Sequence, residues 1–356
     1  MSNLEEAKRH LDIVIKKGRV HLYKPIQLAE ILYAHRKNRD FDLLDLESYR
    51  NISKRWRDAV SQILVGGVST SSARFQDNLF EPNAIPPQLI YALGEENEKP
   101  DRIGIVEAYI YQSLEVKMES LKRLAEYLKN ATPNTFQLGE FIEGFVKDPG
   151  LKRSIDKAYE ITVYAIFTTL VRHLKATVTI GVPNSKIELL REFEDFTKVV
   201  LGLTAEMNEI TIPAMLYRVG VANAADRGLD MWANFGPAVQ IKHLSLTEEF
   251  AEEIVSQVSA DRIVIVCKTA EKNIIERILK QLGFSDKVQG IITQNDLEKW
   301  YAKCFSERYK SVLGATLLKD LNKEFLAEFP SLGDALTGFM ESRGYNLIKK
   351  KGIFAN

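Results

Sequence analysis

The residues best suited to chemistry lie close together in the second half of the chain. Asp230 is followed, after nine residues, by Gln240, Ile241 and Lys242, and Gly236-Pro237 stands between them. This Gly-Pro pair interrupts two β-type runs, so it should connect adjacent antiparallel strands. Because side chains alternate along a strand, Gln240 and Lys242 face one side and Ile241 faces the other. A hairpin of this length can bring Asp230 opposite Gln240 and Lys242.

This arrangement predicts a site for a hard cation. The carboxylate of Asp230, the amide oxygen of Gln240 and the main-chain carbonyl of Ile241 would converge on one point, and Mg²⁺ prefers oxygen ligands. Lys242 would stand beside the ion, where a positive charge can orient a nucleophile or meet developing negative charge. Phosphodiester hydrolysis requires a metal and a cation of this kind. We therefore expect Asp230, Gln240 and Lys242 to be catalytic.

Strands and helices alternate around these residues. The pattern predicts a helix from Ser185, as N-cap with Glu188 in the capping-box position, to about Leu203. It then predicts strands at 212–219, 229–235 and 238–246, a helix at 247–258, a strand at 262–267, a helix at 270–282, a strand at 288–293 and a helix at 295–305. This alternation is typical of an α/β region with a central sheet flanked by helices.

The first half of the chain is mainly helical, since apolar residues recur there at steps of three and four. Helices are predicted at 46–64, 103–129 and across 138–174. Residues 66–100 contain adjacent glycines and four prolines, which predicts a long irregular stretch. The chain is therefore expected to be α+β overall, with a helical region at 1–180 and an α/β core with C-terminal helices at 181–356.

Asp230 with Gln240-Ile241-Lys242, in this strand context, resembles the signature of the PD-(D/E)xK nuclease superfamily in its QxK variant. The order of elements over residues 185–305 is also similar to that of the superfamily core. Within the superfamily, the helical N-terminal half and the stretch from Arg19 to Gln27 resemble type II restriction endonucleases of the HaeII group. The resemblance implies magnesium-dependent cleavage of double-stranded DNA at a short fixed sequence, in the cytoplasm, by a restriction-modification enzyme. It also implies a homodimer that reads a palindrome, with residues 1–180 supplying DNA recognition and dimerisation.

The motif departs from the usual superfamily pattern because Gln240 replaces an acidic residue. A neutral oxygen binds Mg²⁺ less strongly than a charged one, so another carboxylate is expected nearby. Glu194, on the helix preceding the strands, is the best candidate from the sequence. Glu192 and Asp195 on the same helix are the alternatives.

Residues that could read DNA occur in the first half. The segment from Tyr49 to Arg57 is locally basic, and arginine, glutamine and asparagine make the standard contacts to guanine and adenine. The alternative is a solvated helix face followed by a linker. The candidate DNA-binding residues are Arg55, Arg57, Arg74, Gln76 and Asn78.

The charge and composition of the chain narrow the classes of protein that fit the sequence. Basic and acidic residues number 48 each, so the net charge is zero and any basic surface must be local. Cys267 and Cys304 are expected to be small buried residues in a reducing compartment, and no membrane span or nucleotide-binding motif is evident. Two rivals stay open: a modification-dependent or structure-specific nuclease with the same core, and a non-catalytic DNA-binding protein on that scaffold.

Overall fold

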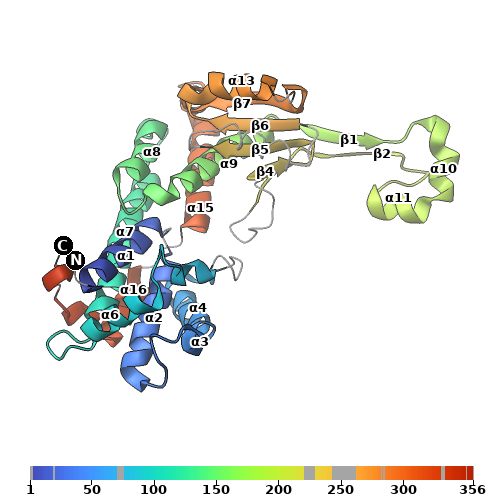
Figure 1. The fold of residues 1–356 in the computed structure, drawn as a ribbon. Coiled ribbons are helices and arrows are strands. Elements are labelled where there is room, and N and C mark those ends of the chain that lie inside the picture. The colour runs from blue at the N-terminus through green and yellow to red at the C-terminus, as the bar shows by residue number, and fades with distance from the viewer. Residues whose placement is uncertain are drawn as a thin grey trace.

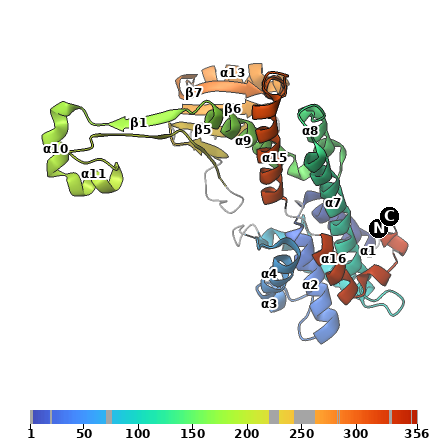
Figure 2. The ribbon, with the colours of Figure 1, turned by 180° about the vertical axis from the view of Figure 1, so that it is seen from behind.

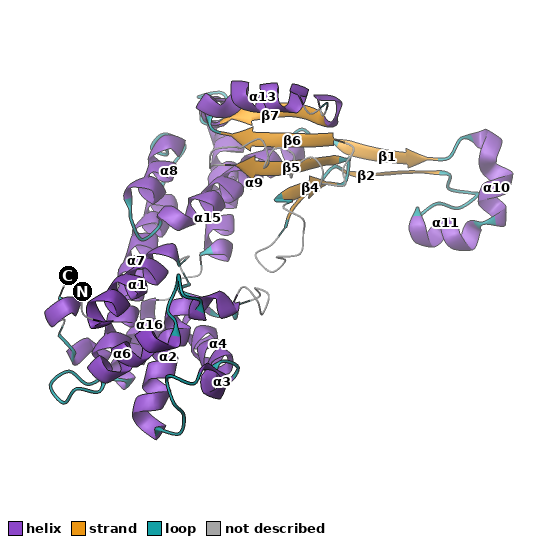
Figure 3. Cartoon of the chain, in the orientation of Figure 1, coloured by secondary structure: helices purple, strands orange, loops and turns teal. Residues whose placement is uncertain are grey.

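The structure is a computed structural model that describes residues 3–18, 21–69, 76–219, 229–242, 262–281, 283, 285–329, 333–349 and 351–355. Helices from the first half of the chain gather at one end of the molecule, and a β-sheet from the second half lies at the other end (Figures 1 and 3). The two termini lie side by side near the first helix in both Figure 1 and the reversed view of Figure 2. The predicted α+β class, with a mixed sheet flanked by helices, is confirmed.

The predicted helical character of the first half is confirmed, with two corrections to its elements. The expected helix at 46–64 is interrupted at Arg50 and Asn51, and the expected irregular stretch contains a helix that begins at Pro87. Proline is tolerated in the first turn of a helix because the amide hydrogen that it lacks has no intrahelical partner there. The helices are α1 (Asn3–Lys17), α2 (Tyr23–Asn38), α3 (Leu46–Tyr49), α4 (Ile52–Val65), α6 (Pro87–Asn97), α7 (Ile105–Asn130), α8 (Leu138–Lys147) and α9 (Ile155–His173).

The central sheet has five strands in the order β3-β4-β5-β6-β7. The first three are antiparallel neighbours, and β5, β6 and β7 run parallel. The expected strand at 212–219 is divided between this sheet and a separate one, and the helix expected at 247–258 lies outside the described residues. The strands are β3 (Leu216–Arg218), β4 (Met231–Ala233), β5 (Pro237–Lys242), β6 (Arg262–Cys267) and β7 (Val288–Thr293).

Helices cover the two faces of the sheet. On one face, α13 (Lys272–Gln281) packs on a cluster that includes Ala238 of β5 and Ile263 and Ile265 of β6. On the other, Val239 and Val266 belong to a large core that also contains α9, α14 (Gln294–Cys304) and α15 (Ala315–Glu328). The predicted strands at 262–267 and 288–293 match the observed bounds, and the buried cysteines are also confirmed.

Residues 177–213 leave the sheet as a projecting arm, which we call the arm from here on (Figures 1 and 2). Strands β1 (Thr177–Gly181) and β2 (Glu209–Pro213) form its two-stranded stem, and α10 (Ile187–Glu192) and α11 (Glu194–Val200) form its tip. The single helix expected from Ser185 to Leu203 is therefore wrong. Its chain breaks at Phe193, and Lys186 rather than Ser185 is the residue that precedes α10.

The C-terminal residues return to the N-terminal helices. Helix α16 (Gly333–Ser342) packs against α7 and α4, and Arg343 donates two 3.0 Å hydrogen bonds to the buried carboxylate of Glu30. The large core is continuous from α1 to α15, and α9 packs against β3 and β5 across the predicted boundary at residue 180. That division into two domains stays a prediction. No helix within the described ranges is long and apolar enough to cross a membrane.

Lys117 of α7 is buried where α1 ends. Its ammonium group donates hydrogen bonds to the main-chain carbonyls of Ile15, at 3.1 Å, and Gly18, at 2.9 Å. Such carbonyls lack partners within a helix, so Lys117 satisfies them from a neighbouring helix. Burial lowers the pKa of Lys117 to about 8, since the charged form loses its hydration.

This burial predicts a pH dependence of stability. Between about pH 8 and the ordinary lysine pKa, the unfolded chain holds a proton that the folded chain has lost. The free energy of unfolding should therefore rise with pH in this window, by at most about 1.4 kcal/mol per pH unit from this group. Burial raises the pKa of Cys267 to about 11, which contributes a slope of the opposite sign.

The measurement is urea unfolding of the wild type and Lys117→Met between pH 7.5 and 9.5. The slope of the free energy of unfolding against pH is compared between the two proteins. Because both contain the same cysteines, the difference between the slopes isolates Lys117. The wild-type slope should be the more positive of the two, and equal slopes would contradict the lowered pKa of Lys117.

Candidate active site

The β4–β5 hairpin brings the predicted site residues together. Met231 pairs with Val239 and Trp232 pairs with Ala238, so the register places Asp230 across from Gln240. The main-chain amide of Asp230 also donates to the carbonyl of Val239 at 3.3 Å. Gly236 makes the turn with a φ of 115°, a conformation that glycine adopts without the strain of a Cβ atom. The predicted hairpin is confirmed.

One carboxylate oxygen of Asp230 holds the two strands together beyond their paired residues. Oδ2 accepts a 2.7 Å hydrogen bond from the main-chain amide of Ile241 and a 2.9 Å bond from Nε2 of Gln240. In an extended strand the N–H and C=O of one residue project to the same side. The carbonyl of Ile241 therefore projects toward the edge where Asp230 lies.

The amide of Gln240 is buried, with 1% of the residue exposed. Its Oε1 atom has no hydrogen-bond partner among the described residues. A buried acceptor without a partner costs free energy, so such an atom invites a ligand or a donor. The assignment of oxygen and nitrogen in an amide depends on its hydrogen bonds, and a half-turn would exchange the two atoms beside Asp230.

Lys242 ends β5, two residues beyond Gln240, and pairs with Cys267 of β6. The alternation of the strand directs it to the same face of the sheet as Gln240. Its side chain lies outside the described residues. The main chain therefore has the placement that the spacing predicts, and the catalytic role of Lys242 stays a prediction.

Glu160 of α9 is a carboxylate near Asp230 that the sequence reasoning missed. It is 6% exposed and accepts hydrogen bonds of 2.8 and 2.6 Å from the ammonium of Lys157. Burial raises the pKa of Glu160 to about 7; Lys157 opposes this shift, while the negative charges of Asp230 and Glu328 add to it. A buried carboxylate that feels the charge of Asp230 is a functional-site candidate. The available signal was an isolated acidic residue just before the apolar run from Ile161 to Leu170.

The structure places Glu194 elsewhere. It begins α11 at the tip of the arm, where Oε2 accepts a 3.4 Å hydrogen bond from the main-chain amide of Ala205. Figure 1 shows this tip well separated from β4 and β5. Glu192 and Asp195 flank it in the same part of the arm. None of the three carboxylates is brought to Asp230, because the arm intervenes between α9 and the strands along the chain.

Further charges surround the site on the α9 side. Arg218 of β3 bridges two glutamates of α15, at 2.7 Å to Glu328 and 3.2 Å to Glu324. No cluster of three carboxylate, imidazole or thiolate groups that could hold a metal occurs within the part of the chain that is described. A cation at Asp230 would therefore need neutral oxygens as well as carboxylates.

The candidate DNA-binding residues differ in how far their side chains are buried. Arg57 is 1% exposed and donates to Gln27, Gln76 and Asp58, so it holds α2 and α4 together. Gln76 accepts from Arg57 and is half-buried, as is Asn78 at the start of a short 3₁₀ turn. Arg55 is exposed on α4, and Arg74 lies outside the described residues. Of the two arginines on α4, only Arg55 has the exposure that a DNA contact needs.

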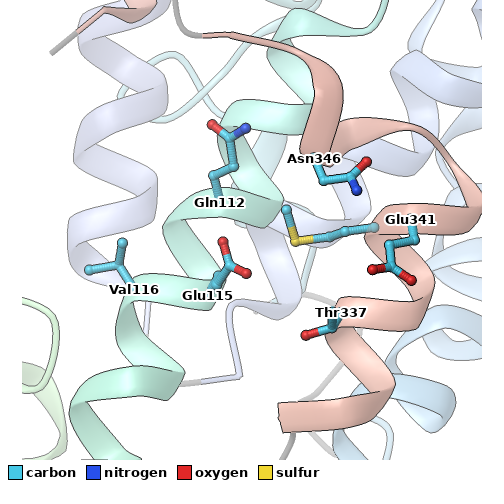
Figure 4. A pocket seen from close by; sticks show the side chains of 7 residues that line it. Gln112, Glu115, Val116, Thr337, Glu341 and Asn346 are labelled. Carbon is cyan, nitrogen blue, oxygen red and sulfur yellow. The ribbon is translucent and has the colours of Figure 1, made fainter.

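A pocket lies between α7 and α16, away from these groups (Figure 4). Its walls carry two carboxylates and no basic side chain, so it does not suit a phosphate. The residues that line it are Gln112, Glu115, Val116, Thr337, Met340, Glu341 and Asn346.

Comparison with known proteins identifies the class as restriction endonucleases. Residues 7–345 match the HaeII restriction endonuclease family. The chain is 50% identical to the type II restriction enzyme HaeII of Haemophilus aegyptius, over 97% of this chain and 98% of that protein. It is 49% identical to the type II restriction enzyme NgoBI of Neisseria gonorrhoeae, over 96% and 97% of the two chains. No solved structure matches. The chain belongs to the HaeII restriction endonuclease family.

The burial of Arg57 and the exposure of Arg55 predict opposite effects of alanine substitution. Arg55→Ala should weaken DNA binding and reduce the slope of log affinity against log salt by about 1, with stability unchanged. Arg57→Ala should lower the free energy of unfolding by about 3 kcal/mol, because it removes one partner of a buried polar network. Salt-dependent fluorescence anisotropy and urea unfolding measure the two effects. Loss of DNA affinity by Arg57→Ala at wild-type stability would contradict this division.

Proposed function

We propose that the chain is a type II restriction endonuclease that hydrolyses phosphodiester bonds of double-stranded DNA at the β4–β5 hairpin. The observation that carries this proposal is the convergence of Asp230, the Gln240 amide and the main chain of Ile241 at one corner of the sheet. The matching family and the two type II restriction enzymes of similar length support the reaction class. Glu160 supplies a second buried carboxylate, whose pKa the charge of Asp230 helps to raise.

The residues present fit a magnesium ion. Asp230 would hold it together with Oε1 of Gln240 and the carbonyl of Ile241. All of these are oxygen ligands, and the buried Oε1 atom has no other partner among the described residues. When bound, Mg²⁺ polarises the scissile phosphate and lowers the pKa of a coordinated water.

The side chains of this corner have distinct roles in the proposal. Asp230 orients Gln240 and fixes the end of β5 through its two hydrogen bonds. Lys242 stabilises the negative charge that develops on the phosphate, as a positioned cation does in phosphoryl transfer. Glu160 is held ready by Lys157, and with its pKa near 7 it can accept a proton close to neutral pH.

The oligomeric state and the cellular location of the enzyme follow from the same reaction. Each chain supplies one such corner, and cutting both strands of a duplex at a palindrome calls for two, so we propose a homodimer with twofold symmetry. We also propose a cytoplasmic location, where a restriction enzyme meets entering DNA. Arg55 is the described residue of α4 that we expect to contact the duplex.

Lys242→Ala tests the reaction and the place of its site together. Purified wild type and variant are incubated with unmethylated phage DNA, with magnesium or with EDTA, and the products are separated by electrophoresis. Discrete fragments from the wild type alone, and only with magnesium, are expected. Cleavage that survives in the variant would mean that the site is misplaced. Absence of cleavage by either protein would favour a modified substrate or a binding protein without activity.

Glu160 and Glu194 form a matched pair, because the same substitution can be made at both. Glu160→Gln should lower the rate of cleavage by about 100-fold or more, as expected when a charged group at the reacting centre is lost. Glu194→Gln should leave the rate unchanged, since its side chain lies at the tip of the arm. Single-turnover cleavage under excess enzyme gives the rate, and anisotropy without metal checks that both variants still bind DNA. The reverse order of effects would restore Glu194 as the assisting carboxylate.

A further inference from the structure

The arm presents apolar side chains that nothing in the described chain covers. Six of them at its tip are between 36% and 84% exposed. A half-exposed phenylalanine alone leaves on the order of 100 Å² in solvent. The tip therefore approaches the largest apolar patch of a typical monomer, roughly 300 to 600 Å². The six are Leu189, Phe193, Phe196, Val199, Val200 and Leu201.

The stem of the arm continues this surface. Val178 pairs with Ile212 and Ile180 with Ile210, so these four side chains share one face of the two-stranded sheet. Ile180 and Ile212 are 37% and 36% exposed. The opposite face is polar, with Thr179 and Thr211 joined at 2.9 Å. An isolated two-stranded sheet is marginally stable in water, so a stem with an uncovered apolar face is suited to packing against another surface.

The charge of the arm argues against DNA as the covering surface. Within residues 177–213, six acidic side chains outnumber three basic ones, which gives a net charge of −3 at neutral pH. A polyanion is repelled by such a surface. The acidic residues are Glu188, Glu192, Glu194, Asp195, Glu206 and Glu209, and the basic residues are Lys186, Arg191 and Lys198.

The count of charges favours a second copy of this chain as the surface that covers the arm. The whole chain has zero net charge, so the residues outside the arm carry a net charge of +3. An arm that reaches the body of a second copy would therefore bring together opposite net charges. The apolar tip and stem, used once by each copy, would form the greater part of a standard interface, which buries about 800 Å² per partner.

We propose that the arm docks on the body of a second copy and that this exchange of arms forms the dimer. The proposal rests on the proposed function for the need of two sites, and it adds the arm to the N-terminal region from which the sequence predicts dimerisation. In a twofold dimer each arm makes the same contact, so a change at the arm weakens both contacts at once.

The test is the oligomeric state of the full chain at micromolar concentration without DNA or metal, measured by sedimentation velocity. Val199→Glu and Phe196→Glu place a charge on the tip at exposed positions, 84% and 56% exposed, where folding is not at stake. Leu347→Glu is the matched control, since Leu347 is 81% exposed and lies outside the arm.

The wild type and Leu347→Glu are expected to sediment as dimers of the 40.4 kDa chain. The arm variants are expected to sediment as monomers, with self-association weakened by about 100-fold or more. A monomeric wild type would overturn the proposal. Arm variants that stay dimeric would also overturn it, even if they lose DNA binding. Because neither DNA nor metal is present, a failure here is separate from a failure of cleavage, which the Lys242→Ala assay reports.

Discussion

The packing of helix α9 between other helices and the sheet holds the rest of the structure together. It packs against α8, α14 and α15 as well as against β3 and β5, and most of its residues from Ile155 to Ile166 are inaccessible to water. This helix joins the helical end of the molecule to the sheet, so the candidate site residues on β4 and β5 are supported by the packed core. Against this apolar background, Glu160 is a costly exception, because a buried carboxylate loses its hydration. Lys157 compensates for only part of that cost, and burial keeps the pKa of Glu160 raised. A carboxylate buried at such a cost, with a pKa that the charge of Asp230 helps to raise, is a candidate for a functional role.

The neutral residue at position 240 avoids a second buried charge beside Asp230. The carboxylate of Asp230 already places one negative charge beside the Gln240 amide, which donates a hydrogen bond to it. A glutamate in the buried place of Gln240 would add a second negative charge there, with no described cation in hydrogen-bond contact. The amide supplies an oxygen without that charge. A neutral side chain at position 240 therefore lowers the cost of folding this corner and also weakens its attraction for a cation.

The parts of the site that could be predicted from the sequence are those fixed by local geometry. The spacing from Asp230 to Lys242 and the Gly-Pro turn determine a hairpin, and alternation along β5 then determines which residues share a face. Glu160 could not be found in this way, because nearness along the chain suggested Glu194, whereas the arm carries Glu194 away and leaves α9 beside the strands. The burial of Arg57 could not be predicted from the sequence for a related reason. Its burial depends on Gln27 of α2, a partner thirty positions away that no local pattern reveals.

The separation of charge between arm and body bears on how a chain of zero net charge can bind DNA at all. Long-range attraction depends on the distribution of charge over the surface as well as on its sum. With a net charge of −3 on the arm and +3 on the remainder, an approaching duplex is drawn toward the body and turned away from the arm. The acidic arm would thus stay clear of the duplex and remain available for protein contacts. The net charge of the whole chain is zero because the acidic arm offsets a basic remainder. The arm repels DNA, and the remainder attracts it.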